Sequence, residues 1–274
     1  MILINGRPGA SIQVMDRGLQ YGDGVFETIA IVNGRPLCLD AHLRRLESGC
    51  RALGIPVPDL RALSTESAQV AADQSRAVLK IIVTRGAGGR GYQSPQDASP
   101  TRIVSLHPWP DYPEGYRTTG IDALFCRFTL ALQPALAGIK HLNRLEQVLV
   151  RDEIGRSDCA EGFVADSTGA IIEGSMSNLF LRQGRMLLTP DLKDCGVAGI
   201  VRAEILRHAG TLGLEARVQR VVPADVLAAD EVFFTNSIIG IWPVRRAGEH
   251  GFAAADYAHR LAQALAVAGC IAPA

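Results

Sequence analysis

The chain has 274 residues and equal numbers of basic and acidic residues, 28 of each, so its formal charge is zero. This balance argues against nucleic acids and anionic membranes as partners, because both are bound through an excess of positive charge. Hydrophobic residues make up 47% of the chain and charged residues 20%, which excludes a disordered protein and suffices for one large domain or two smaller ones.

The cysteines and the N-terminal residues indicate a reducing compartment. Six cysteines are scattered without a Cys-x-x-Cys pair or a Cys/His cluster, so buried thiols are expected and a metal site is not. No uncharged apolar run approaches the roughly 18 residues of a membrane span. Residues 1–6 show no basic stretch ahead of their apolar residues. We therefore expect a cytoplasmic protein.

The first hundred residues predict a mixture of strands and helices. Asn33-Gly34 favours a tight hairpin turn, because both residues tolerate positive φ. Asp40 is the expected N-cap of an amphipathic helix, which Gly54 and Pro56 would end. The expected elements are strands over 25–31 and 36–39, a helix over 40–53, a helix over 60–73, strands over 77–83 and 103–106, and a glycine-rich turn over 85–92.

Three prolines within six residues, Pro108, Pro110 and Pro113, mark the expected domain boundary, because proline interrupts helices and central strands. We place a linker at 108–117, between an N-terminal α/β domain (1–107) and a C-terminal α/β domain (118–274). The second domain is expected to contain helices over 142–153, 199–209 and 256–267, and short strands over 163–165, 171–173, 178–181, 186–188, 218–222 and 232–234. Strands grouped beside separate helices favour α/β or α+β layers over a regular βαβ series.

Lysine is the scarce basic residue, and this narrows the search for a reactive amine. Only Lys80, Lys140 and Lys193 are lysines, and arginine does not lose its proton in proteins. Lys140 precedes a predicted helix, whose positive end would disfavour the ammonium form. Lys80 is a rival because it lies within an apolar strand, whereas Lys193 is expected in a solvated loop.

Three further segments carry groups suited to holding a cofactor. Glu173 ends a predicted strand and precedes a polar turn, and the glycine-bearing turn over 196–199 opens a helix whose free amides could bind phosphate. Thr235-Asn236-Ser237 offers hydroxyls at the end of a strand. Taken alone, each segment is equally consistent with ordinary turn chemistry. Together, an amine, a carboxylate and a phosphate cradle are what pyridoxal phosphate requires.

The order of these motifs resembles that of the class IV aminotransferase family, the fold type IV pyridoxal phosphate enzymes. The resemblance covers nearly the whole chain. It rests on Asp16-Arg17-Gly18-Leu19-Gln20-Tyr21-Gly22-Asp23-Gly24-Val25-Phe26-Glu27, Arg45, Lys140, residues 173–180 and Gly199-Ile200. It implies a two-domain α/β (α+β layered) fold like that of D-amino acid aminotransferases, pyridoxal 5'-phosphate as cofactor, a small-molecule substrate and a homodimer.

Within that family, two segments resemble the aminodeoxychorismate lyases of folate biosynthesis. They are Thr84-Arg85-Gly86 leading to residues 89–92, and Gly138-Ile139-Lys140-His141-Leu142-Asn143-Arg144-Leu145-Glu146-Gln147-Val148-Leu149. The resemblance implies a lyase that converts 4-amino-4-deoxychorismate into 4-aminobenzoate and pyruvate. The twelve-residue segment is the more specific of the two.

The resemblance also assigns roles to individual residues. Lys140 would bind the cofactor covalently and act in catalysis, and Glu173 would pair with the pyridine nitrogen. The phosphate would be held by a set of side-chain and backbone donors, namely Arg45, the amides of Ile200 and Val201, and the Ser237 hydroxyl. The residues expected at the substrate are Arg90, Tyr92 and Phe26.

Two other functions remain open. In D-amino acid aminotransferases an Arg-x-His pair grips the substrate carboxylate and a Tyr follows Gly-Asp-Gly-Val, whereas this chain has Arg90-Gly91-Tyr92 and Phe26. Branched-chain aminotransferases have a Tyr shortly after the reactive lysine, where this chain has residues 142–145, Leu-Asn-Arg-Leu. Both departures favour the lyase over an aminotransferase. A non-catalytic protein that merely binds pyridoxal phosphate is the alternative from another class.

Overall fold

The computed structural model describes residues 1–252 and 255–273, and the chain divides into two compact units. The first unit comprises Met1–Pro110 and Ile139–Asn143, and the second comprises Asp111–Gly138 and Arg144–Ala274. The division at Pro110 falls within the proline-rich segment. The short segment that carries Lys140 groups with the first unit, although it follows that segment in the chain.

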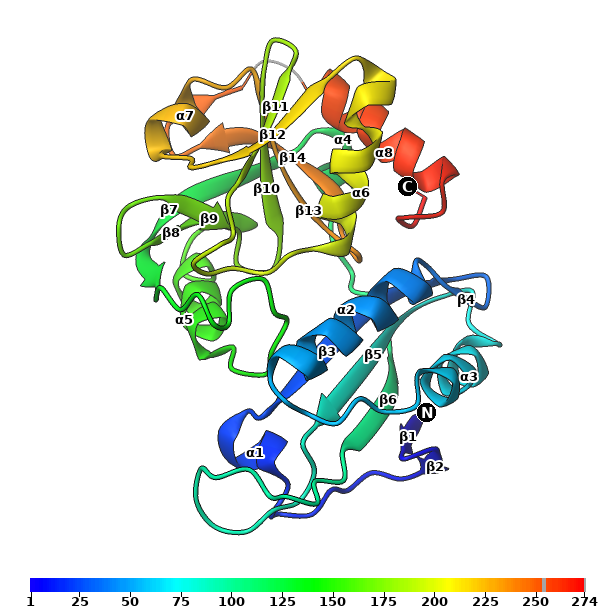
Figure 1. Ribbon diagram of the computed structural model, residues 1–274. Helices are drawn as coiled ribbons and strands as arrows, with labels where there is room; N and C mark the ends of the chain where they lie inside the picture. The colour runs from blue at the N-terminus through cyan, green and yellow to red at the C-terminus, as the bar shows by residue number, and fades with distance from the viewer. Residues whose placement is uncertain (253–254, 274) are drawn as a thin grey trace. The chain divides into compact units, whose positions relative to one another are not determined.

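The first unit is built on a six-stranded antiparallel sheet with the order β2-β1-β6-β5-β3-β4 (Figure 1). Its strands are β1 (Ile2–Ile4), β2 (Arg7–Pro8), β3 (Gly24–Val32), β4 (Arg35–Pro36), β5 (Arg76–Thr84) and β6 (Thr101–His107). The expected hairpin is confirmed, because β3 and β4 pair around Asn33 and Gly34, whose φ angles are 49° and 76°.

Three helices accompany this sheet: α1 (Arg17–Tyr21), α2 (Leu39–Ala52) and α3 (Leu60–Ala71). The helices α2 and α3 contact each other and bury Leu46 and Leu63 against β3, β5 and β6. The expected N-cap at Asp40 is wrong, because α2 begins at Leu39 and follows Cys38, whose φ is 51°. Asp40 lies instead in the first turn, where its negative charge interacts favourably with the positive end of the helix dipole.

The second unit contains a nine-stranded mixed sheet with the order β12-β11-β10-β13-β14-β7-β8-β9, and β15 pairs with β14. The strands are β7 (Ile121–Leu130), β8 (Glu161–Asp166), β9 (Ile171–Glu173), β10 (Asn178–Gln183), β11 (Met186–Pro190), β12 (Glu215–Gln219), β13 (Glu231–Asn236), β14 (Gly240–Ala247) and β15 (His250–Gly251). The neighbours β7 and β14 pair in parallel at the centre of the sheet. Sequence patterns did not predict either strand, since both pairings of β7 are irregular and β14 contains Pro243.

Helices cover this sheet and enclose a core that includes Phe163, Phe234 and Trp242. They are α4 (Gly115–Thr118), α5 (Leu145–Ile154), α6 (Ile200–His208), the 3-10 turn η1 (Ala209–Leu212), α7 (Pro223–Leu227) and α8 (Asp256–Val267). The helix α5 packs on β7 and β8, and α6 and α8 contact each other and β13 (Figure 1). Among the described residues, no helix has both the length and the apolar character needed to cross a membrane.

Candidate functional site

Lys140 lies in a short extended segment that pairs with β3. The Phe26 amide donates to the Lys140 carbonyl at 3.0 Å, and the Leu142 amide donates to the Gly24 carbonyl at 2.9 Å. The helix expected from residue 142 therefore begins only at Leu145, five residues after Lys140. The effect of a helix dipole on Lys140 that the sequence predicts is therefore wrong, since the dipole acts within the first turn of a helix.

The amine of Lys140 lies over the aromatic ring of Phe26. The Lys140 Nζ is 4.3 Å from the ring centre, and the Nζ of Lys80 is 5.5 Å from the same centre. Both lysines are half-buried, whereas the side chain of Lys193 is 72% exposed. The structure thus keeps two of the three lysines near a single ring and leaves the third in solvent. A lysine amine at such a position can act as a nucleophile toward a carbonyl when it is unprotonated.

The residue after Phe26 on β3, Glu27, is a buried carboxylate that binds Arg45. Glu27 on β3 accepts hydrogen bonds from Arg45 Nε at 2.8 Å and Arg45 Nη2 at 2.5 Å, and its Oε2 lies 2.6 Å from His42 Nδ1. His42 and Arg45 stand three residues apart on α2, so one face of the helix presents both to Glu27. Glu27 is 1% exposed, and the side chain of Arg45 is 15% exposed. The pair fixes the orientation of the guanidinium.

The charges in this cluster shift the pKa values of Glu27 and His42. Burial raises the pKa of Glu27. The charge and hydrogen bonds of Arg45, together with His42, have the opposite and larger effect, so the pKa is lowered to about 2. Burial lowers the pKa of His42, and the positive charges of Arg45 and Lys140 add to this effect, so that they outweigh the bond to Glu27. The cluster therefore contains an ionised Glu27 at neutral pH, and Lys140 is close enough to influence His42 electrostatically.

In the second unit, Glu173 lies at the end of β9 and is 4% exposed. Its Oε2 accepts a hydrogen bond from the Val197 amide at 2.8 Å, which orients the carboxylate. A second carboxylate, which sequence reasoning missed, shapes the turn that follows Glu173. Glu161 on β8 is fully buried and accepts from the amide of Ser175 at 2.8 Å, from its hydroxyl at 2.6 Å and from the Ser177 hydroxyl at 2.9 Å.

The turn before α6 has the features of an anion site. Asn178 Nδ2 donates to the Val197 carbonyl at 2.8 Å. The Gly138 amide donates to the Gly196 carbonyl at 2.9 Å, and the Ala198 amide donates to the Gly138 carbonyl at 3.1 Å. Gly199 precedes the helix and has no side chain to cap the first-turn amides, which include those of Ile200 and Val201. A side chain at position 199 would collide with Asn178 Oδ1, so this close approach requires glycine.

Ser237 follows β13 in a tight turn of the second unit. Asn236 shapes this turn, because its Oδ1 accepts from the amides of Ile238 at 2.8 Å and Ile239 at 2.9 Å, while its Nδ2 donates to the Met176 carbonyl at 3.0 Å. Asn236 thereby links the turn that bears Ser237 to the turn that follows Glu173. Sequence reasoning named Asn236 only as part of a polar segment.

The expected substrate residues all lie in the first unit. Phe26 is on β3 against Lys140, and Arg90 and Tyr92 are exposed on the loop between β5 and β6. The first unit therefore contains Lys140, Arg45 and these three residues, and the second contains Glu173, Ile200, Val201 and Ser237. The predicted site residues are therefore divided between the two units.

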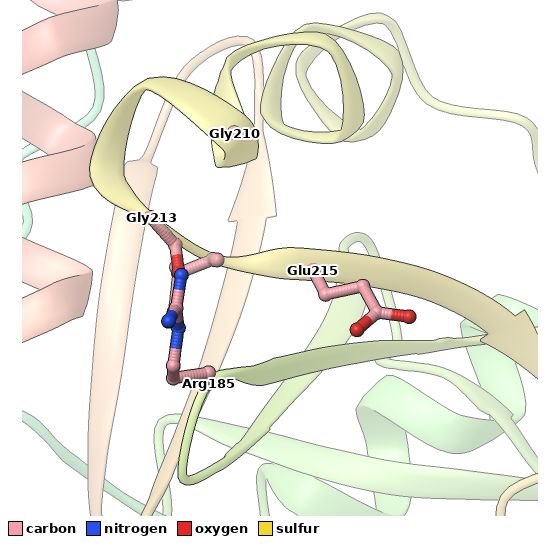
Figure 2. A pocket seen from close by; sticks show the side chains of 5 residues that line it. Arg185, Gly210, Gly213 and Glu215 are labelled. Carbon is pink, nitrogen blue, oxygen red and sulfur yellow. The ribbon is translucent and has the colours of Figure 1, made fainter.

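A separate hollow of about 500 Å3 lies beside η1 and β12 in the second unit (Figure 2). Its lining consists of Arg185, Gly210, Gly213, Leu214 and Glu215. Arg185 Nε donates to the Gly213 carbonyl at 3.1 Å, so the guanidinium serves to tie two backbone segments together. None of the residues predicted from the sequence lines this hollow.

A family model described as amino-transferase class IV matches residues 24–247. An aminodeoxychorismate lyase of Vibrio harveyi is 35% identical over 244 residues, which cover 89% of this chain and 90% of the relative.

Two solved structures are also similar. The crystal structure of 4-amino-4-deoxychorismate lyase from Pseudomonas aeruginosa is 47% identical, with a TM-score of 0.93 over 97% of this chain and 98% of that one. A crystal structure of the branched-chain amino acid aminotransferase from Escherichia coli is 28% identical, with a TM-score of 0.88 over 96% of this chain and 92% of that one.

The buried pair of Glu27 and Arg45 generates a prediction for acid stability. Because the pKa of Glu27 falls from 4.5 to about 2 on folding, its carboxylate stabilises the fold above about pH 4.5 and loses this effect as the pH falls toward 2. Between about pH 5 and pH 2, the free energy of unfolding should fall by roughly 3 kcal/mol more in the wild type than in Glu27→Gln. Urea unfolding at a series of pH values measures this difference.

The matched control for this measurement is Glu47→Gln. Glu47 pairs with Arg51 on α2, and the Arg51 side chain is 68% exposed, so the loss of this pair should leave the acid dependence close to that of the wild type. Parallel curves for the wild type and Glu27→Gln would contradict the prediction.

Proposed function

The chain belongs to the amino-transferase class IV family, and we propose that it converts 4-amino-4-deoxychorismate into 4-aminobenzoate and pyruvate, with pyridoxal 5'-phosphate as cofactor. The observation that carries this proposal is the likeness to the lyase of Pseudomonas aeruginosa, which extends over almost the whole chain at nearly half of its positions. The similarity to the Escherichia coli aminotransferase is as extensive but much lower in identity.

The donor groups of the chain fit this cofactor. An aldehyde needs an amine, a pyridine nitrogen needs a carboxylate to stay protonated, and a phosphate needs cationic and amide donors. The chain offers Lys140 beside Phe26, the buried carboxylate of Glu173, and the first-turn amides of α6 behind a side-chain-free cap. When bound, pyridoxal phosphate supplies an electron sink for the carbon next to the substrate nitrogen.

Lys140 is proposed to be both the covalent anchor of the cofactor and the catalytic base. Its Nζ, once displaced by the substrate amine, is free to remove the proton from the carbon that bears the substrate nitrogen. The resulting ammonium can then return a proton to the departing enolpyruvate. The Nζ of Lys140 lies 4.3 Å from the centre of the Phe26 ring, and this contact restricts the positions that the amine can take.

The remaining assignments concern charge. Glu173, oriented by the Val197 amide, is proposed to hold a proton on the pyridine nitrogen. Arg45, the amides of Ile200 and Val201, and the hydroxyl of Ser237 are proposed to bind the phosphate. Glu27 supports Arg45 in this role, because two hydrogen bonds from the guanidinium to one buried carboxylate fix its plane.

Recognition of the substrate is assigned to three side chains. Arg90 carries a positive charge suited to a carboxylate, and Tyr92 offers an exposed aromatic ring and hydroxyl on the same loop. Phe26 provides an apolar surface next to the amine of Lys140. The rings of Phe26 and Tyr92 suit a six-membered carbocyclic substrate, and the charge of Arg90 suits its carboxylates.

An aminotransferase of the same family is the second candidate, and the similarity to the Escherichia coli branched-chain amino acid aminotransferase is the observation that supports it. The two activities differ in one requirement. The lyase releases pyruvate from 4-amino-4-deoxychorismate without any keto-acid acceptor, whereas an aminotransferase needs one. Pyruvate release without an acceptor therefore separates the two, and a protein that only binds the cofactor would give neither product.

Lys140→Ala should abolish pyruvate release and remove the cofactor adduct that borohydride traps in the wild type, because no other side chain supplies the amine. The measurements are pyruvate formation from 4-amino-4-deoxychorismate and mass spectrometry of the borohydride-treated protein. Lys193→Ala is the control, since that lysine is exposed and should leave both results unchanged. Wild-type pyruvate release by Lys140→Ala would transfer the role to Lys80, whose Nζ lies near the same ring.

Glu173→Gln should keep the cofactor bound but slow turnover by about a hundredfold, because a neutral amide cannot hold the pyridine nitrogen in its charged form. Visible absorbance of the purified protein reports cofactor binding, and steady-state kinetics report turnover. An unchanged kcat in a variant that still binds the cofactor would remove Glu173 from this role.

We further propose that the enzyme acts as a homodimer in the cytoplasm, in the synthesis of folate. Three exposed apolar side chains on α5, Leu145, Val148 and Leu149, offer surface that a second copy would cover. None of the six cysteines forms a disulfide among the described residues, which suits a reducing compartment. Sedimentation velocity should give a mass near twice 29.3 kDa, and a monomer mass would contradict the dimer.

A further inference from the structure

We propose that Arg17 is a positioning residue, which holds the loop bearing Arg90 and Tyr92 in the conformation that binds substrate. This inference rests on the proposed function, because it takes Arg90 and Tyr92 as substrate residues. Sequence reasoning placed Arg17 within a family motif and gave it no task. Its contacts all lie within the first unit.

The guanidinium of Arg17 binds the backbone of that loop at three consecutive residues. Arg17 Nη1 donates to the Gly91 carbonyl at 3.0 Å and to the Gln93 carbonyl at 3.4 Å, and Nη2 donates to the Tyr92 carbonyl at 3.0 Å. Arg17 is only 3% exposed, although the residues it binds lie on an open loop. A planar group with five donors can serve several acceptors at once, which a lysine amine cannot do in the same geometry.

Arg17 is itself held from the other side. Its Nε donates to Asp23 Oδ2 at 2.8 Å, and Arg85 Nε donates to the same oxygen at 2.7 Å. Arg85 in turn binds the carbonyls of Leu53 and Gly54 at 2.8 and 2.6 Å, after α2. The guanidinium is therefore anchored to the body of the unit through a carboxylate that two arginines share.

Tyr21 gives the loop a second support from the same helix. Arg17 and Tyr21 are four residues apart on α1, and the Arg17 guanidinium carbon lies 4.9 Å from the centre of the Tyr21 ring. The Gly91 amide donates to the Tyr21 hydroxyl at 3.3 Å, and the rings of Tyr21 and Tyr92 meet edge to face at 5.4 Å. Side chains of one short helix, α1 (labelled in Figure 1), thus bind both the carbonyls and an amide of the loop.

The arrangement fixes the loop backbone while its functional side chains remain outside. Tyr92 is 86% exposed, and Arg90 is exposed and makes no hydrogen bond or ion pair with any described residue. Gly88, on the same loop, leaves room for Arg17, since a Cβ there would lie 3.0 Å from Arg17 Cδ. A loop ordered before binding loses less conformational entropy when substrate arrives, which raises affinity without new contacts.

Replacing Arg17 with Met keeps the length of the side chain and removes its donors. In Arg17→Met holoenzyme, limited trypsin treatment should cut the Arg90–Gly91 bond about tenfold faster, because the loop backbone is released. The KM for 4-amino-4-deoxychorismate should rise about tenfold, while kcat stays within about threefold of wild type, since Lys140 and Glu173 are untouched. Mass spectrometry of the tryptic fragments identifies the cut bond.

Two further variants make the result specific. Arg17→Lys keeps the charge beside Asp23 and should fold even if Arg17→Met does not, and it should show the same rise in cleavage and KM because one amine cannot span three carbonyls. Arg102→Met removes a comparable partly buried pair, with Glu66, that does not contact the loop, and both measurements should stay at their wild-type values. In an Arg90→Ala/Tyr92→Ala background, Arg17→Lys should raise KM no further.

Unchanged cleavage at Arg90–Gly91 in the folded Arg17 variants would overturn the proposal, and so would an unchanged KM or a further KM increase in the double-alanine background. A wild-type protein that released no pyruvate would instead contradict the proposed function. The two failures are distinguishable, because the cleavage experiment needs no turnover.

Discussion

The pairing of residues 139–143 with β3 is the interaction on which the proposed chemistry depends. Two backbone hydrogen bonds, from Phe26 to Lys140 and from Leu142 to Gly24, hold the segment in place and bring the lysine amine over the Phe26 ring. The same strand carries Glu27 toward α2, because successive side chains of a strand point to opposite faces. One strand therefore supports both the amine of Lys140 and, through Glu27, the guanidinium of Arg45.

Buried and partly buried carboxylates organise the rest of the predicted site. Glu27 binds Arg45, Asp23 binds Arg17 and Arg85, and Glu161 binds two serines of the turn after Glu173. A buried charge is costly unless it is paired or hydrogen-bonded, so each carboxylate fixes its partners in a narrow geometry. Of the arginines so held, Arg45 is proposed to bind the phosphate, whereas Arg17 and Arg85 bind backbone carbonyls. Rigidity of this kind is what a site needs to orient a cofactor and a substrate.

Lyase and aminotransferase activities in this family require similar cofactor chemistry, so the difference must come from the side chains that meet the substrate. In this chain the side chains proposed to meet the substrate are Phe26, Arg90 and Tyr92. The two loop residues are exposed and Phe26 is half-buried, and the backbone of the loop is fixed by Arg17 and Tyr21. Specificity can then change through exposed side chains while the supporting network of the unit stays the same.

Periodicity, turn residues and family motifs in the sequence were enough to predict most helices, the Asn33-Gly34 hairpin and the family, because these depend on local patterns. The reactive role of Lys140 stays a prediction, and it rests on the small number of lysines and on the family motif. The central strands β7 and β14 and the true start of α5 could not be predicted, since long-range pairing decides them. Only the tertiary structure showed that Lys140 pairs with β3, that Glu27 binds Arg45 and that Arg17 binds the loop at 91–93. Those contacts join residues from 18 to 114 positions apart in the chain, and no local pattern specifies them.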